Sequence, residues 1–195
     1  PGSGPLIDML RAEGITAGIG HSNAGYDAAC SAIDRGISYA THLGNAMRPI
    51  HHRDPGAVGA CLLDNRARVE IIPDGVHLHP AFVKMVVNMK GADGVIGVTD
   101  SLCGVPARKP GYPFGGGDIY ALEDRYAYKD GTIAGSRLTM NTALKNLVKF
   151  TGKDIADCVK FLTINPLQAA GLAKHRGVLK AGCDADIAVI DDDFD

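Results

Sequence analysis

The sequence lacks any uninterrupted apolar stretch long enough to cross a membrane. Although 46% of its 195 residues are hydrophobic, apolar residues nowhere run for the roughly 20 positions that a transmembrane helix requires. An excess of basic charge is also missing. The net charge is -2 and the sequence pI is about 6.4, so no positive field is available for a polyanion. We therefore expect one folded core, with neither a membrane nor nucleic acid as a partner.

Paired cysteines are missing as well. The five cysteines form no Cys-x-x-Cys pair and are odd in number, so a disulfide framework is not indicated. Irregular, unpaired cysteines favour reduced thiols and a cytoplasmic location. The chain begins Pro1-Gly2-Ser3-Gly4 without an initiator methionine, and we expect its natural start to lie further upstream.

The triple-glycine run lacks the residues that would make it a phosphate-binding loop. Gly115-Gly116-Gly117 is not followed by Gly-Lys-Ser/Thr, so the run predicts a turn. Residues 101–135 are rich in glycine and proline, with short alternating segments at 118–122 and 126–128. This region predicts a loop followed by a hairpin.

The sequence does contain four short segments typical of buried strands. They span residues 15–20, 37–41, 69–74 and 95–99. Each leads to a side chain that can bind a metal or a proton, namely His21, His42, His77 and Asp100. Enzymes built as parallel α/β barrels carry their chemistry at the C-terminal ends of successive strands. We therefore expect these four side chains at one edge of a parallel sheet.

Helical periodicity separates the four strands. Residues 26–35 end before Gly36, which suits a helix C-terminus, and residues 82–90 follow Pro80, which the first helical turn tolerates. Alternating strands and helices predict an α/β fold with right-handed crossovers. A closed barrel needs eight such units and about 250 residues, so four units predict half of a barrel.

Helices dominate the expected structure further along the chain. We expect them at residues 137–150 with Ser136 as N-cap, at 155–162 with Asp154 as N-cap, and at 167–172 after a break at Asn165-Pro166. Residues 177–190 predict a turn followed by a strand.

Five ordered motifs resemble those of N-acetylglucosamine-6-phosphate deacetylases. They are Gly20-His21-Ser22-Asn23-Ala24, Thr41-His42-Leu43-Gly44-Asn45-Ala46-Met47, His51-His52-Arg53-Asp54-Pro55-Gly56, Asp74-Gly75-Val76-His77 and Val98-Thr99-Asp100-Ser101. The tail at 177–187 is similar to that of many amidohydrolase-superfamily enzymes. The resemblance implies that residues 1–174 are strands five to eight of a metal-dependent-hydrolase (β/α)8 barrel. Residues 175–195 would be part of a small β-sandwich domain.

The resemblance also implies a reaction and a site. The complete protein would hydrolyse the acetamido group of N-acetylglucosamine 6-phosphate to acetate and glucosamine 6-phosphate, in amino-sugar catabolism. His21 and His42 would bind a divalent metal, which lowers the pKa of a bound water and polarises the carbonyl. Zinc is expected first, and iron, manganese and cobalt suit the same ligands. Asp100 would act as the base.

Other residues of the family's motifs are implied to hold the substrate, and the family implies a homodimer. The substrate-binding positions are Asn45, Ala46, Arg53, His77 and Leu138. Two positions depart from the family pattern. Gly44 stands where an aromatic residue is usual, and Arg137 stands where a smaller residue is common.

Several alternatives stay open from the residues alone. Arg53 could be a surface ion-pair partner of Asp54 or of another carboxylate, and His79 could be a helix-entry residue. We expect His51, His52 and His175 to have no catalytic role. The chain could be a non-catalytic fragment that folds or assembles without activity, or an amidohydrolase that acts on another amide.

Overall fold

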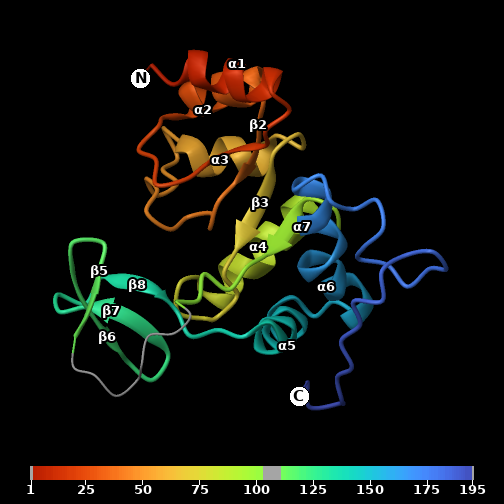
Figure 1. Cartoon of the computed structure of the whole chain (residues 1–195). Helices are drawn as coiled ribbons and strands as arrows, with labels where there is room; N and C mark the ends of the chain where they lie inside the picture. The colour runs from red at the N-terminus through yellow and green to blue at the C-terminus, as the bar shows by residue number, and fades with distance from the viewer. Residues whose placement is uncertain (1, 103–110, 195) are drawn as a thin grey trace.

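A four-stranded parallel sheet forms the centre of the computed structural model, which describes residues 2–102 and 111–194. Its strands are β1 (Ala17–Ile19), β2 (Ile37–Ala40), β3 (Arg68–Ile71) and β4 (Val95–Gly97), hydrogen-bonded in that order (Figure 1). Every neighbouring pair is parallel. The predicted α/β fold and all four predicted strands are confirmed, although each strand is shorter than its apolar segment.

One helix precedes β1 and three connect the successive strands. They are α1 (Gly4–Ala12), α2 (Tyr26–Arg35), α3 (Gly56–Leu63) and α4 (Pro80–Lys90), and each packs against the next. α2 ends before Gly36, whose φ of 131° few other residues adopt. α4 starts at Pro80, and the His79 ring accepts a hydrogen bond from the Ala81 N–H at 3.1 Å. The predicted helix signals at both places are confirmed.

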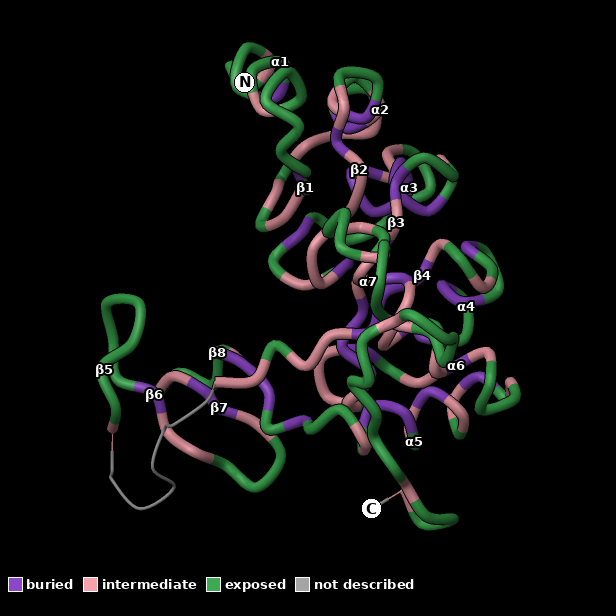
Figure 2. Tube along the Cα trace, turned by 45° about the vertical axis from the view of Figure 1, so that its right-hand side comes forward, coloured by how far each residue is buried: buried purple, intermediate pink, exposed green. Residues whose placement is uncertain are grey.

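The main core lies between the sheet and its helices, where the buried residues gather (Figure 2). Val69 and Ile71 of β3 are fully buried with Val83 and Val87 of α4. Because side chains alternate along a strand, Glu70 points to the opposite face of the sheet. There it lines, with other residues of the sheet, a hollow of about 480 Å³.

A second sheet follows Asp100 in the chain and is antiparallel. It consists of β5 (Tyr112–Phe114), β6 (Gly117–Ala121), β7 (Arg125–Tyr128) and β8 (Ile133–Ser136), in that order (Figure 1). The single predicted hairpin was therefore too small. Gly115 and Gly116 form the β5–β6 turn with φ of 56° and 94°, which confirms the predicted turn. Part of the loop predicted at the start of residues 101–135, namely 103–110, lies outside the described residues.

The start of α5 (Met140–Thr151) corrects one prediction. Ser136 does not cap this helix, because it belongs to β8 and Thr139 is the N-cap residue. The Ser136 hydroxyl instead donates to the Thr99 carbonyl and accepts from the Leu138 N–H at 3.0 Å. The hydroxyl of a serine that precedes a helix can thus bond to a distant part of the chain, which sequence periodicity does not reveal.

The following helix, α6 (Ile155–Leu162), has its predicted bounds, but α7 (Ile164–Ala169) does not. The predicted break at Asn165-Pro166 was wrong, since both residues lie in the first turn of α7. Pro166 is tolerated there because the first four N–H groups of a helix have no intrahelical partner. Asn165 is buried, and its side-chain nitrogen donates to the carbonyls of Ala92 and Val95 at 2.8 and 2.7 Å.

The tail contains no strand at 177–190, so that prediction was wrong for this chain. Leu179 and Val189 are 88% and 89% exposed. A strand needs the backbone of a second strand as its hydrogen-bond partner, and none lies beside these residues in the described part of the chain. Among the described helices, none combines the length and the apolar character that crossing a membrane requires.

A buried lysine joins two helices of the parallel-sheet region. Lys90 is 7% exposed, and its ammonium group donates to the carbonyls of Cys61 and Asp64 at 2.9 and 2.7 Å. These carbonyls lie at the C-terminus of α3, where intrahelical donors are missing. Burial lowers the pKa of Lys90.

Replacing this lysine should destabilise the fold. Lys90→Met keeps the apolar stem but leaves two carbonyls without their donor, so we expect the free energy of unfolding to fall by about 1–3 kcal/mol. Urea unfolding followed by circular dichroism measures the change. Lys84→Met is the control, because Lys84 is exposed on the same helix. Equal stabilities of the two variants would contradict the assigned role.

Candidate active site

The side chains predicted to carry chemistry lie just beyond the C-terminal ends of the parallel strands. His21 follows β1, His42 follows β2 and Asp100 follows β4, each within three residues of the strand end. All three have positive φ, at 45°, 28° and 49°. Positive φ is uncommon for residues other than glycine, although Asp and His adopt it more readily than most, and it costs about 1–3 kcal/mol for each residue. The sheet therefore stabilises three strained turns at one edge.

His21 and His42 approach each other directly. Their Nε2 atoms are 3.0 Å apart, and the rings meet edge to face with centroids 4.7 Å apart. Two nitrogens that bind one zinc ion at about 2.0–2.1 Å in tetrahedral geometry lie about 3.4 Å apart. The observed separation is that of a hydrogen bond between the rings and is slightly shorter than this value, so both nitrogens lie where one metal ion could contact them. Among the described residues, no group of three or more His, Cys, Asp or Glu completes such a site.

Glu70 supports the turn that carries His42. Its Oε2 atom accepts from the Thr41 hydroxyl at 2.6 Å and from the His42 N–H at 3.4 Å, and its carbonyl accepts from the Leu43 N–H at 2.8 Å. The Asn45 amide also donates to the His42 carbonyl at 3.2 Å. Glu70 was missed from the sequence, although a charged residue inside an apolar strand was its signal.

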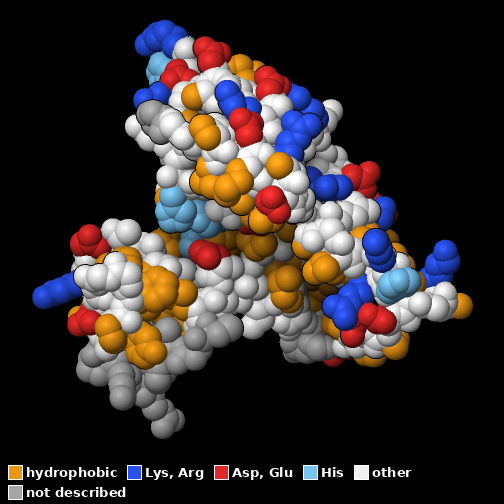
Figure 3. Space-filling view, turned by 45° about the horizontal axis from the view of Figure 1, so that its top comes forward, with side chains coloured by type: hydrophobic (Ala, Val, Ile, Leu, Met, Phe, Trp, Pro, Cys, Tyr) orange, Lys and Arg blue, Asp and Glu red, His pale blue; other side chains and the backbone are white. Residues whose placement is uncertain are grey.

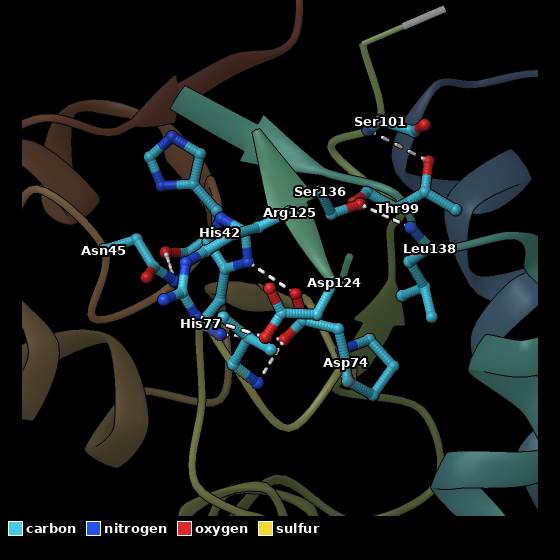
Figure 4. Close-up of polar contacts among 12 residues, drawn as sticks. His42, Asn45, Asp74, His77, Thr99, Ser101, Asp124, Arg125, Ser136 and Leu138 are labelled. Atoms are coloured by element: carbon cyan, nitrogen blue, oxygen red, sulfur yellow. Dashed lines mark hydrogen bonds and ion pairs between the residues drawn. The ribbon is translucent and has the colours of Figure 1, made fainter. Parts of the chain in front are cut away.

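His77 is held by Asp74 rather than by the end of a strand. It lies six residues beyond β3, in a loop where Asp74 Oδ2 and His77 Nδ1 are 2.6 Å apart (Figure 4). Asp74 Oδ1 accepts from the Val76 and His77 N–H groups at 2.9 and 2.8 Å. Burial opposes the charge of Asp74, but these bonds outweigh it, so the pKa of this carboxyl is lowered. A neutral His77 thus keeps its proton on Nδ1 and presents Nε2 as an acceptor.

Arg53 is exposed and makes no ion pair in the described part of the chain. The alternative that pairs it with Asp54 was wrong, because Asp54 pairs with Arg48. The same carboxylate accepts from the N–H groups of Gly56 and Tyr26 at the starts of α3 and α2. These two bonds lower the pKa of Asp54. The Arg53 guanidinium is therefore available to a ligand.

Two further predicted positions differ in exposure. Ala46 is exposed, with φ of 50°, beside Asn45. Leu138 is 6% exposed and packs with Ile72 and Ala143. A substrate contact by the Leu138 side chain stays a prediction, because this side chain lies in a small core. His79 is the helix-entry residue that one alternative expected.

The antiparallel sheet joins the candidate site through β8. Ser136 N–H donates to the Asp100 carbonyl at 2.9 Å, and Ser136 forms a parallel bridge with Ser101. A group of histidine side chains lies where the parallel-sheet region meets the β5–β8 sheet (Figure 3). Figure 4 draws Asp124 and Arg125 in the same region as His42, Asn45, Asp74 and His77. These two hairpin residues were missed, since only the tertiary fold brings them there.

Comparison with protein families gives one match over most of the chain. The model of the amidohydrolase family matches residues 11–195. The N-acetylglucosamine-6-phosphate deacetylase of Lysinibacillus sphaericus is 36% identical over 192 residues, which cover 98% of this chain and 49% of that protein. The Bacillus subtilis deacetylase is 34% identical, with coverage of 96% and 48%. The chain thus spans about half the length of these curated relatives.

Solved structures agree with the sequence comparison. The N-acetylglucosamine-6-phosphate deacetylase of Pasteurella multocida superposes with a TM-score of 0.93 at 32% identity, covering 99% of this chain and 51% of that one. A variant of the Mycobacterium smegmatis deacetylase in complex with N-acetyl-D-glucosamine-6-phosphate gives 0.93 at 34%, with the same coverage. The resemblance found in the sequence motifs is confirmed. The chain belongs to the amidohydrolase family.

Proposed function

We propose that the complete protein is an N-acetylglucosamine-6-phosphate deacetylase and that these residues are the C-terminal half of its (β/α)8 barrel. The four parallel strands with helical crossovers support this, as does coverage of half of each relative. The hollow over Glu70 would be part of the barrel interior. The β5–β8 sheet would be an insertion after the last barrel strand.

The observation that carries the proposal is the 3.0 Å approach of His21 Nε2 to His42 Nε2. Two neutral imidazoles aimed at one point suit a divalent metal, zinc first and iron, manganese or cobalt as alternatives. A bound cation would supply an activated water and a polarised acetamido carbonyl. Glu70 would orient His42, because its carboxylate accepts from the His42 N–H and from the Thr41 hydroxyl. The remaining ligands would come from the other half of the barrel.

Asp100 is the proposed base. Amide hydrolysis needs a group that takes a proton from the attacking water and returns it to the departing amine. The Asp100 side chain is exposed beyond β4, at the same edge of the sheet as the two histidines. Its strained backbone is held by the Ser136 N–H, which donates to its carbonyl.

The substrate would be held by a cation and by hydrogen-bonding groups beside the metal. The free guanidinium of Arg53 suits a phosphate, because its forked donors match phosphate oxygens. Asn45 offers donors and acceptors to sugar hydroxyls, and the Ala46 backbone lies beside it. His77 would present Nε2, with Asp74 fixing the ring. Leu138 would support the site through its packing against Ile72 and Ala143.

Metal content and acetate release test this proposal together. We expect a longer product of the same gene, carrying residues before Pro1, to hold stoichiometric metal and to release acetate from N-acetylglucosamine 6-phosphate. The 195-residue chain alone should do neither, because two ligands hold a catalytic ion poorly. His42→Ala in the longer product should lose metal, whereas His175→Ala should keep it. A metal-loaded longer product that releases no acetate would refute the assigned substrate.

Asp100→Asn separates the base from the metal ligands. The amide cannot accept the proton of water, so we expect turnover to fall by at least about a hundredfold while metal content stays unchanged. Asp93→Asn is the matched control, because Asp93 lies at the opposite end of the same strand. Steady-state kinetics and metal analysis are measured on both variants. Retention of most turnover by Asp100→Asn would exclude this residue as the base.

A further inference from the structure

Arg125 lies close to the candidate base although 25 residues of sequence separate them. It opens β7 and is the register partner of Ser136 in β8. Ser136 in turn bonds to the Asp100 carbonyl at 2.9 Å and bridges to Ser101. Two strand spacings of about 4.8 Å therefore place the Arg125 backbone roughly 10 Å from that of Asp100. A residue at this distance can contact the far end of a ligand whose reacting group lies at Asp100.

The Arg125 side chain is only partly satisfied. Its Nη1 atom is 3.2 Å from Asp124 Oδ2, whereas its Nε atom is buried and has no hydrogen-bond partner in the described part of the chain. Buried polar groups in native structures nearly always have a partner, so an orphaned donor calls for an explanation. Figure 4 draws this side chain in the region of His42, Asn45 and His77. An oxygen of a bound ligand would satisfy it.

The turn that precedes Arg125 is held by Arg137, the residue after β8. Arg137 Nη1 donates to the carbonyls of Leu122 and Glu123 at 2.7 and 3.3 Å. These two bonds hold the turn between β6 and β7. Arg137 is one of the positions at which this chain departs from the usual family pattern. Its contacts give that departure a physical role, because a smaller residue could not reach these carbonyls.

A purely structural role for Arg125 explains less. Its ion pair joins adjacent residues, and Asp124 is half exposed, so the pair contributes little to stability. The pair also leaves Nε without an acceptor. Asp124 instead keeps the guanidinium in place, with Nε and the second terminal nitrogen free to form a fork toward one oxyanion.

We propose that Arg125 is a second phosphate-binding arginine of the site, acting with Arg53. Its Nε–H and free terminal N–H donate to phosphoryl oxygens of the sugar phosphate, while Asp124 and the Arg137-held turn set its position. This inference rests on the proposed function. It adds to that function a residue that recognises the anionic end of the substrate and is supplied by the β5–β8 sheet.

Calorimetric binding to the complete, metal-loaded protein tests the inference. The ligands are N-acetylglucosamine 6-phosphate, neutral N-acetylglucosamine and inorganic phosphate, measured with Asp100→Asn so that substrate is not consumed. We expect Arg125→Gln to weaken binding of the phosphosugar and of inorganic phosphate about tenfold or more. Binding of the neutral sugar should be unchanged. Arg176→Gln is the control, because that arginine is exposed and pairs with Asp184 in the tail.

The variants also separate charge from folding. Arg125→Lys keeps the stem and the cation, so it should fold like the parent and recover part of the phosphosugar affinity. Unchanged phosphosugar binding in Arg125→Gln, or an equal loss for the neutral sugar, overturns the inference while the proposed function stands. If the parent protein binds the neutral sugar but neither the phosphosugar nor inorganic phosphate, the phosphosugar function and this inference both fail.

Discussion

Parallel pairing of β1 to β4 is the constraint on which the rest of the structure depends. It brings the C-terminal ends of all four strands to one edge, so side chains separated by up to 79 positions, from His21 to Asp100, share that edge. Parallel strands need helical crossovers, and the helices bury the opposite face of each strand in the core. The core thereby helps to stabilise the strained turns at His21, His42 and Asp100.

A few hydrogen bonds connect this sheet to the antiparallel one. Ser136 contacts the carbonyls of both Thr99 and Asp100, and Gly135 lets the two backbones approach, since a Cβ there would lie 3.0 Å from the Asp100 carbonyl oxygen. The position of Arg125 relative to Asp100 follows from this junction. One bond comes from the Ser136 hydroxyl and the other from its N–H, and both end on backbone carbonyls, so the junction does not depend on surface ion pairs.

Sequence periodicity and ordered motifs predicted what is local. The four strands, α2, the start of α4 and the contact between the regions of His21 and His42 follow from alternation and from parallel topology. The tail strand was predicted wrongly because its pattern is apolar but its partner strand is not among the described residues. Contacts set by tertiary structure, such as those of Glu70 with Thr41 and of Asp54 with Arg48, could not be predicted from spacing.

Unsatisfied polar atoms and strained backbone together mark the site better than either does alone. Three buried side-chain atoms in the described residues lack partners: His42 Nδ1, Arg125 Nε and Asn165 Oδ1. Asn165 lies in α7, where its amide nitrogen already makes two bonds and no neighbouring residue has strained backbone, so its oxygen is a packing compromise. His42 itself has positive φ. Arg125 pairs with Ser136, which bonds to Asp100, and Asp100 also has positive φ. Under the proposed function a ligand oxygen would satisfy Arg125 Nε, whereas His42 Nδ1 lies on the other side of the ring from the metal-facing Nε2 and would need an acceptor of its own.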